Sequence, residues 1–185
     1  MLQVEIDSAV RTVFGKGEMR RLRNNEFTPA SLYSGGTPPI ALQFKTADLF
    51  RKLKFIHGRN AVITVKIAGD TAAQRHVLVK EIQKDVVTDE LIHVDFLEID
   101  LEKELEFVVP LKYTGKARGV EMGGDLQVYR DSIRLKGRPL EIPDEVEANI
   151  SNLDKAGAPI TCGDLQVTGE VTMLEAADVA CIEVV

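Results

Sequence analysis

Apolar and polar residues alternate along two stretches in the first half of the chain. The first covers residues 61–68, and in the second Val94 and Phe96 alternate with His93 and Asp95. A repeat of two residues is typical of a strand with one buried face. The pattern therefore predicts that the two apolar side chains enter a core, and that the histidine and the aspartate share the opposite face.

Shorter apolar runs between turn-forming residues predict the other strands of the first half. A turn at Asp7-Ser8 is expected to separate the first two. Residues 18–24 and 46–56 instead have helical spacing, and Thr46 is a plausible N-cap of the longer helix. The remaining strands are expected at residues 3–6, 10–14, 30–33, 40–44 and 76–82.

The second half again shows short strand-like runs. Pro110 interrupts the first of them, which predicts an edge strand because proline cannot donate to a neighbouring strand. The expected strands are residues 106–113, 126–129, 133–136, 140–143, 146–150, 166–171 and 179–184. The predicted fold class is mainly β with few helices, in two domains comprising residues 1–98 and 99–185.

Acidic residues recur at every second position across the join between these halves. This spacing could hold a metal or an acid/base pair, but the solvated face of a strand explains it more simply. The residues are Glu98, Asp100, Glu102, Glu104 and Glu106.

Composition narrows the class of protein. A hydrophobic content of 44% excludes wholesale disorder, and the absence of tryptophan means that Val, Ile and Leu must fill the cores. The sequence contains no apolar run of about 18 residues, as a membrane helix would need, and the first residues do not resemble a secretory signal. Two cysteines, Cys162 and Cys181, have no metal-type spacing and suggest a reducing cytoplasm rather than a disulfide framework.

Charge is distributed unevenly. The net charge is −6, made up of +1 over residues 1–100 and −7 over residues 101–185. Against this background residues 11–23 hold five basic residues and one acid, with Lys16 between two glycines. The cluster is either a solvated helix face or a contact for a phosphate-rich partner. A nucleotide-binding P-loop is excluded because its upstream glycine and its Ser/Thr are missing.

Three interpretations of His93 and Asp95 remain open from the residues alone: a structural surface pair, a nucleic-acid contact, or a catalytic base with its orienting carboxylate. Catalysis would require a nucleophile, and no G-x-S-x-G motif is present. A metal site would require a third ligand, and neither His57 nor His76 has a recognisable spacing for one. Tyr33, at the edge of a glycine-rich loop, could be a half-buried core aromatic or a contact for a sugar or phosphate.

Two stretches taken together resemble one known family. The first is Gly15-Lys16-Gly17-Glu18-Met19-Arg20-Arg21-Leu22-Arg23 with the following Tyr33, and the second is residues 77–83 followed by His93-Val94-Asp95-Phe96. They are similar to the bacterial large-subunit ribosomal protein that binds 5S ribosomal RNA, in its long two-domain form, the CTC or general stress protein type. Looser matches at Gly123-Gly124-Asp125-Leu126 and Gly163-Asp164-Leu165 extend the resemblance over the whole chain.

The resemblance implies an N-terminal β-barrel-like domain that binds 5S rRNA, and a mostly β second domain. It implies a cytoplasmic, ribosome-associated, non-enzymatic protein without cofactor, metal, membrane or small-molecule substrate. Its partners would be 5S rRNA and neighbouring large-subunit proteins. Carried over residue by residue, the RNA contacts are Arg11, Lys16, Arg20, Arg21, Tyr33, Gln83, His93 and Asp95.

The chain departs from the family at two places. Asp85-Val86 follow Gln83-Lys84 where a histidine and a proline are common, and Ser34 follows the tyrosine where a glycine is common. Two rival functions are kept. An adaptor acting through the acidic half predicts basic side chains paired to internal acids, and a hydrolase using His93 and Asp95 predicts a nucleophile in a closed pocket.

Overall fold

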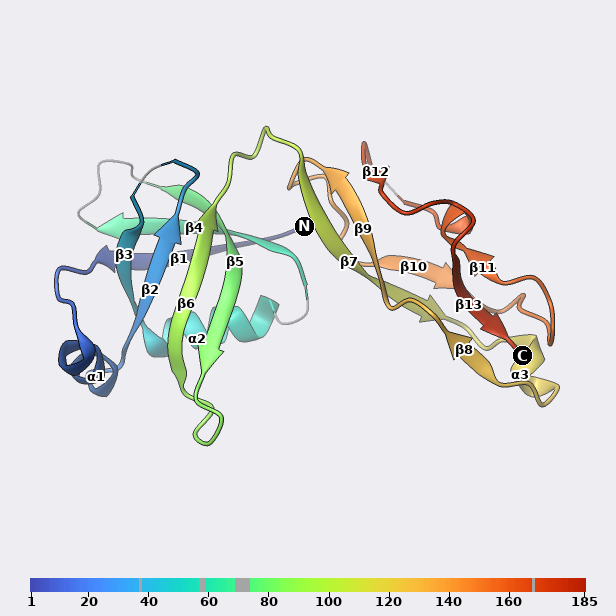
Figure 1. Ribbon diagram of the computed structural model, residues 1–185, viewed down its shortest axis with the longest axis horizontal. Helices are drawn as coiled ribbons and strands as arrows, with labels where there is room; N and C mark the ends of the chain where they lie inside the picture. Colours follow the sequence, from blue (N-terminus) through green and yellow to red (C-terminus); the bar gives the residue numbers. More distant parts are fainter. Residues whose placement is uncertain (37, 57–58, 69–73, 168) are drawn as a thin grey trace. The chain divides into compact units, whose positions relative to one another are not determined.

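The computed structural model describes residues 1–36, 38–56, 59–68, 74–167 and 169–185. The chain separates into two compact units, Leu2–Leu101 and Met1 together with Glu102–Val185 (Figure 1). Both units are built chiefly from strands, which confirms the predicted fold class. Among the described residues, no helix has the length and apolar character needed to span a membrane.

Six strands of the first unit form a closed barrel, as the family resemblance implied. The barrel closes because the first strand pairs in parallel with the fourth. Their order around the barrel is β1 (Leu2–Val10), β3 (Ile40–Lys45), β2 (Phe27–Tyr33), β6 (Leu91–Glu98), β5 (Arg75–Lys84) and β4 (Ala61–Ala68).

Strand β1 corrects one prediction, since it runs without a turn through Asp7 and Ser8. Its register with β4 is continuous from Leu2 opposite Ala61 to Ala9 opposite Ala68. Ser8 takes an inward position and donates a hydrogen bond from Oγ to the Lys66 carbonyl at 3.3 Å. A partner strand therefore keeps extended a segment whose sequence alone suggests a turn.

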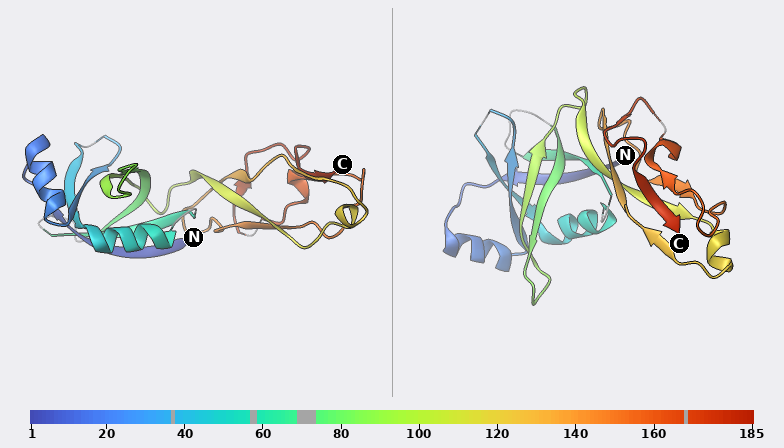
Figure 2. Two further views of the ribbon diagram at one scale, coloured as in Figure 1. Left: turned by 90° about the horizontal axis from the view of Figure 1, so that it is seen from below. Right: turned by 45° about the vertical axis from the view of Figure 1, so that its right-hand side comes forward.

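Two helices accompany the barrel, α1 (Lys16–Asn24) and α2 (Thr46–Ile56) (Figures 1 and 2). Helix α2 buries Leu49, Leu53 and Ile56 against β1, β2 and β3. Each such side chain contributes about 1.5–3 kcal/mol when fully buried. In the barrel core the rings of Phe44 and Phe96 lie 5.4 Å apart in a tilted arrangement.

The second unit contains two sheets. One has the order β10 (Val146–Asn149), β7 (Leu105–Thr114), β9 (Ser132–Gly137) and β12 (Thr172–Met173), and the other β11 (Ile160–Thr161), β13 (Ala180–Val184) and β8 (Leu126–Val128). A short helix α3 (Arg118–Glu121) and a 3-10 turn η1 (Cys162–Asp164) complete it.

Pro110 does not make β7 an edge strand, because β7 is paired on both sides. On one side Pro110 faces Ser132 of β9. On the other, the parallel pairing with β10 begins only at Leu111, one residue after the proline. The missing amide hydrogen therefore falls outside that ladder.

Other predictions for the second half were wrong in detail. Residues 140–143 lie in a turn instead of a strand, and the described residues of 166–171 contain no strand. The alternating acids do not form one face, because β6 ends at Glu98 and β7 begins at Leu105. Alternation over a few residues does not predict a strand reliably here, because the pattern cannot show whether a neighbouring strand is available to pair with the segment.

The two cysteines meet in the core of the second unit. The Cys162 and Cys181 thiols are buried and form no disulfide, and their sulfur atoms share a hydrogen bond of 3.3 Å. Burial, with a smaller effect from the Cys162 contact, raises the pKa of Cys181 to about 12. They act as small apolar groups in this core.

Candidate nucleic-acid interface

Three neighbouring strands, β2, β6 and β5, carry polar side chains on the outside of the barrel. Val94 and Phe96 of β6 are fully buried, and His93 and Asp95 point to the opposite face, as their alternation predicted. The side chains of His93 and Asp95 retain 23% and 17% exposure. They can therefore be held by protein groups and still contact a partner.

The register of the strands determines which residues share this face. In the parallel β2–β6 pair Ser31 lies beside Asp95. In the antiparallel β5–β6 pair Gln83 lies opposite His93 and Glu81 opposite Asp95. Tyr33 extends the row on β2, two residues beyond Ser31.

Asp95 is the centre of the hydrogen bonding on this face. The Tyr33 hydroxyl donates to its Oδ1 at 3.0 Å, and Nδ1 of His93 lies 3.1 Å from the same atom. Nε2 of His93 lies 3.3 Å from Oγ of Ser31. A neutral ring with its proton on Nδ1 can donate to Asp95 and accept from Ser31. Burial, together with the bond to Asp95, raises the pKa of Tyr33.

Two residues of this face were missed by the sequence analysis, Ser31 and Glu81. Both are two residues from a predicted contact, Tyr33 and Gln83, so the period of a strand could have found them. Gln83 Nε2 donates to Glu81 Oε1 at 3.0 Å. Glu81 also faces Asp95, and two carboxylates at directly opposed positions repel each other.

Helix α1 supplies the basic side chains. Gly15 precedes it with φ 97°, a left-handed conformation that glycine adopts without steric cost. Lys16, Arg20 and Arg21 are all exposed on this helix. Arg21 pairs with Glu18 at 2.6 Å, whereas no acid in the described part of the chain pairs with Lys16 or Arg20.

Helix α1 lies beside the polar face. It packs against β2, and the Arg23 guanidinium donates to the carbonyl of Ile92, next to His93, at 3.4 Å. The helix therefore meets the start of β6, at the His93 end of the row, whereas Tyr33 is the last residue of β2 and pairs with Leu97. The adaptor hypothesis required these cations to be paired internally, and only Arg21 meets that requirement.

Arg11 differs from the other predicted contacts because it is only 9% exposed. Its Nη1 donates to the Val13 carbonyl at 2.9 Å and to the Met19 sulfur at 3.1 Å, and its guanidinium lies 5.1 Å from the Phe14 ring centre. Its Nε has no partner among the described residues, and burial lowers its pKa. Arg11 therefore connects the segment before α1 to the helix itself.

The side-chain contacts from Ser31 to His93 and from His93 to Asp95 have the same sequence of groups as a catalytic triad. The hydrolase hypothesis therefore needs a structural test. Ser31 lies on β2, which is hydrogen-bonded to a strand on each side. The backbone amides of β2 at Ser31 are used in pairing with β3 and β6. An oxyanion hole needs free donors beside the nucleophile, so this position does not favour a hydrolase. For a metal, the described residues contain no suitable group of three His, Cys, Asp or Glu side chains.

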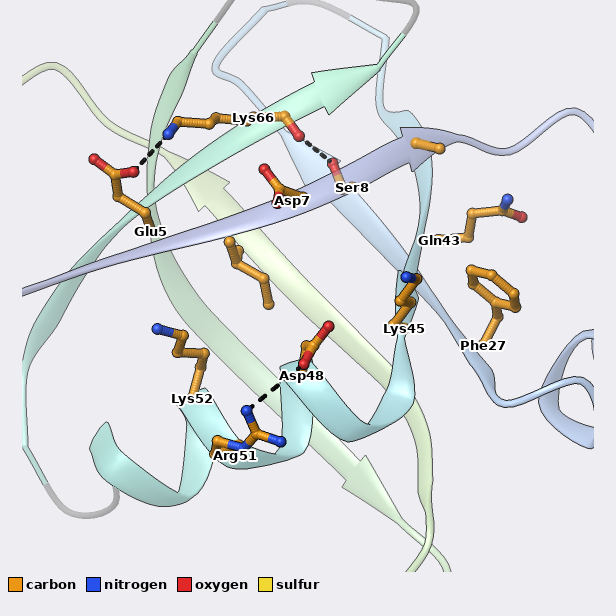
Figure 3. Close-up of a pocket in the computed structure, with 12 residues that line it drawn as sticks. Glu5, Asp7, Ser8, Phe27, Gln43, Lys45, Asp48, Arg51, Lys52 and Lys66 are labelled. Atoms are coloured by element: carbon orange, nitrogen blue, oxygen red, sulfur yellow. Dashed lines mark hydrogen bonds and ion pairs between the residues drawn. The ribbon is translucent and has the colours of Figure 1, made fainter.

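A separate cavity of about 500 Å³ lies between β1, β3, β4 and α2 (Figure 3). Its charges largely pair with each other, Lys66 with Glu5 at 2.6 Å and Arg51 with Asp48 at 3.9 Å. None of the eight predicted contact residues lines it. We therefore do not assign the candidate interface to this cavity.

Comparison with known proteins gives a family for both units. Residues 6–96 match the ribosomal L25p family, and residues 104–185 match the C-terminal domain of ribosomal protein TL5. The chain is 40% identical over 177 residues to large ribosomal subunit protein bL25 of Desulfotalea psychrophila, covering 96% of this chain and 95% of that protein. Identity to the bL25 proteins of Syntrophus aciditrophicus and Thermotoga petrophila is 30% and 35%, covering 97% and 92% of this chain and 90% and 80% of theirs.

These matches extend over both units and confirm the resemblance found in the sequence. The chain therefore belongs to the ribosomal L25p family, in its long two-domain form, and is a cytoplasmic, non-enzymatic structural constituent of the large ribosomal subunit.

Proposed function

We propose that the N-terminal domain, residues 1–98, binds 5S ribosomal RNA through its polar barrel face and helix α1. The observation that carries the proposal is that Tyr33 and His93 both contact the same carboxylate oxygen of Asp95 on an outward face of the barrel. The proposed contacts are Arg11, Lys16, Arg20, Arg21, Tyr33, Gln83, His93 and Asp95.

The two parts of this surface suit different parts of an RNA. Lys16, Arg20 and Arg21 carry exposed charge that can neutralise phosphates, which contributes affinity and salt dependence. Arg11 supports the proposal differently, because its contacts hold the start of α1 in place. Its contribution to binding is expected to come mainly from positioning that helix.

The barrel face suits base edges and sugars. A carboxylate is repelled by phosphates unless it accepts a defined hydrogen bond, so Asp95 favours RNA groups that donate. Both of its bonds involve Oδ1, which leaves Oδ2 without a partner among the described residues. Ribose 2′-hydroxyls and base amino groups, displayed in the wide, shallow minor groove of an RNA helix, are such donors.

The acidic second domain is assigned a different partner. Its charge of −7 over residues 101–185 opposes RNA binding. We expect it to contact neighbouring large-subunit proteins or to face solvent.

The test is binding of 5S rRNA across a salt series, with an unrelated duplex RNA as competitor. Wild-type binding should survive the competitor and weaken log-linearly with salt. Arg20→Ala and Asp95→Ala should both weaken binding, and only the arginine change should lower the slope, by about 0.7–0.9 for one lost phosphate contact. Binding that the competitor removes, or equal slopes in all three proteins, would contradict the proposal.

A further inference from the structure

The hairpin between β5 and β6 ends in two valines that contact almost nothing. Val86 is 100% exposed and Val87 is 92% exposed. No other large apolar side chain in the described part of the chain is exposed to this extent. Singly scattered exposed apolar residues are normal, whereas contiguous exposed apolar surface marks an interaction site, and the two valines are adjacent at the end of the turn.

The turn is rigidly built around Asp85. Its Oδ1 accepts hydrogen bonds from the Val87 amide at 2.8 Å and the Thr88 amide at 3.1 Å. Backbone bonds of 2.9 Å join Asp85 to Asp89 and to Glu90. These amide donors lower the pKa of the Asp85 carboxyl. A turn fixed in this way loses little conformational entropy when it binds.

Charge around the tip decides which kind of partner fits. Between residues 84 and 90 the chain has one cation, Lys84, and three acids, Asp85, Asp89 and Glu90. Lys84 is paired with Asp89 at 3.1 Å. The tip therefore has a net charge of −2, which repels RNA phosphates and complements a basic protein surface.

We propose that Val86 and Val87 insert into a shallow apolar pocket, rimmed by Lys or Arg, on another protein of the large ribosomal subunit. The tip adjoins the proposed RNA surface, since Arg20 lines the same hollow as Asp85, Asp89 and Glu90, but the proposed contact is made by the two valines. It combines an apolar centre with a charged rim, as specific protein interfaces do. RNA is the competing partner, because Gln83 and His93 lie on the two strands that lead into this hairpin.

Photo-crosslinking identifies the partner class directly. A benzophenone amino acid replaces Val87 in the full-length protein, which is then incorporated into large subunits that lack it. The same amino acid at Phe55, 62% exposed on α2, is the matched control. We expect the Val87 probe to crosslink to one ribosomal protein, beside apolar and basic residues. Crosslinks to rRNA, or none above the control, would overturn the proposal.

A double variant, Val86→Ser with Val87→Ser, measures the contribution of the tip, with Phe55→Ser as control. Both valines are exposed, so the melting temperature should not change. Retention on large subunits during a salt wash should fall about tenfold, as for the loss of an interface anchor, while affinity for isolated 5S rRNA should stay within about twofold. Unchanged retention, or an equal loss of RNA affinity, would contradict the proposal. RNA binding by the wild-type protein separately reports whether the proposed function holds.

Discussion

The Tyr33 hydroxyl donates a hydrogen bond of 3.0 Å to Oδ1 of Asp95, across 62 positions of sequence. The two residues lie on neighbouring parallel strands, β2 and β6. Because His93 contacts the same oxygen, Tyr33 and His93 together limit the orientations that the carboxylate can adopt. The orientation of Asp95 is thus set before any partner arrives.

Tyr33→Phe tests whether this orientation matters for RNA binding. The variant keeps the ring and removes one hydrogen bond, a loss of about 0.5–1.5 kcal/mol. We expect 5S rRNA affinity to fall about two- to tenfold with an unchanged salt slope, because no phosphate contact is lost. Filter binding at several salt concentrations measures both. An unchanged affinity would show that Tyr33 does not help Asp95 to bind RNA.

Arg11 and Arg20 should behave differently when each is changed to alanine. Arg11→Ala removes buried contacts and should lower the free energy of unfolding by about 1–2 kcal/mol. Arg20→Ala removes an exposed cation and should leave stability within about 0.5 kcal/mol. Denaturant unfolding measures both values.

Arg11→Lys is the informative control for that comparison. It keeps the charge but loses the planar guanidinium that bonds Val13 and lies over Phe14. We expect it to destabilise the domain nearly as much as alanine. Full rescue by lysine would mean that charge, and not positioning, is the role of Arg11.

Stability of the second unit should fall in alkaline solution. Burial raises the pKa of Tyr113 from 10.0 to about 12, and its hydroxyl donates to the Arg130 carbonyl at 2.5 Å. The pKa of Cys181 rises from 9.0 to about 12. Both groups keep protons in the native state that the unfolded chain releases, so their stabilisation is complete below about pH 9 and is lost as the pH rises to about 12.

The measurement is urea unfolding at a series of pH values from 8 to about 11, with tyrosinate absorbance as a second signal. Tyr113→Phe should flatten the decline by about 1 kcal/mol over this range, since pH 11 lies about one unit above the ordinary tyrosine pKa and each pKa unit corresponds to about 1.4 kcal/mol. If the free energy of unfolding of this variant declined with pH as steeply as that of the wild type, groups other than Tyr113 would be responsible.

Two glycines should respond oppositely to alanine. A Cβ at Gly119 in α3 would lie 2.5 Å from the Lys155 amide nitrogen and 2.8 Å from a Val184 methyl. A Cβ at Gly17 in α1 would have no such neighbour within 4 Å. We expect Gly119→Ala to destabilise the second unit by about 1–3 kcal/mol, and Gly17→Ala to stabilise the first by up to about 1 kcal/mol. Calorimetry measures both, and a neutral Gly119→Ala would show that α3 can move away.

Much of the site could be predicted from residue spacing. His93 and Asp95 alternate with two buried residues, so the period of a strand is enough to place them together outside the core. The buried positions of α2 follow from its helical spacing in the same way. The family came from motifs at fixed distances in the chain, which also need no tertiary information.

Contacts between distant segments could not be predicted this way. Tyr33 meets Asp95, and Ser31 and Glu81 join the same face, because β2 and β5 pair with β6 in particular registers. The burial of Arg11 depends on how the segment before α1 packs against that helix. The meeting of Cys162 and Cys181 likewise depends on the pairing of β11 with β13.

The sequence by itself determined the mainly β class, the outward His93 and Asp95, and the basic composition of residues 11–23. Tertiary structure alone decided that β1 is continuous, that β7 is central, and that Arg11 is buried. The physical reason is that the period of the side chains is a property of one helix or strand and can be read from its own residues. Whether a strand stays extended, whether it lies at the edge of a sheet and whether a side chain is buried depend on which remote segments pack against it and supply its hydrogen-bond partners.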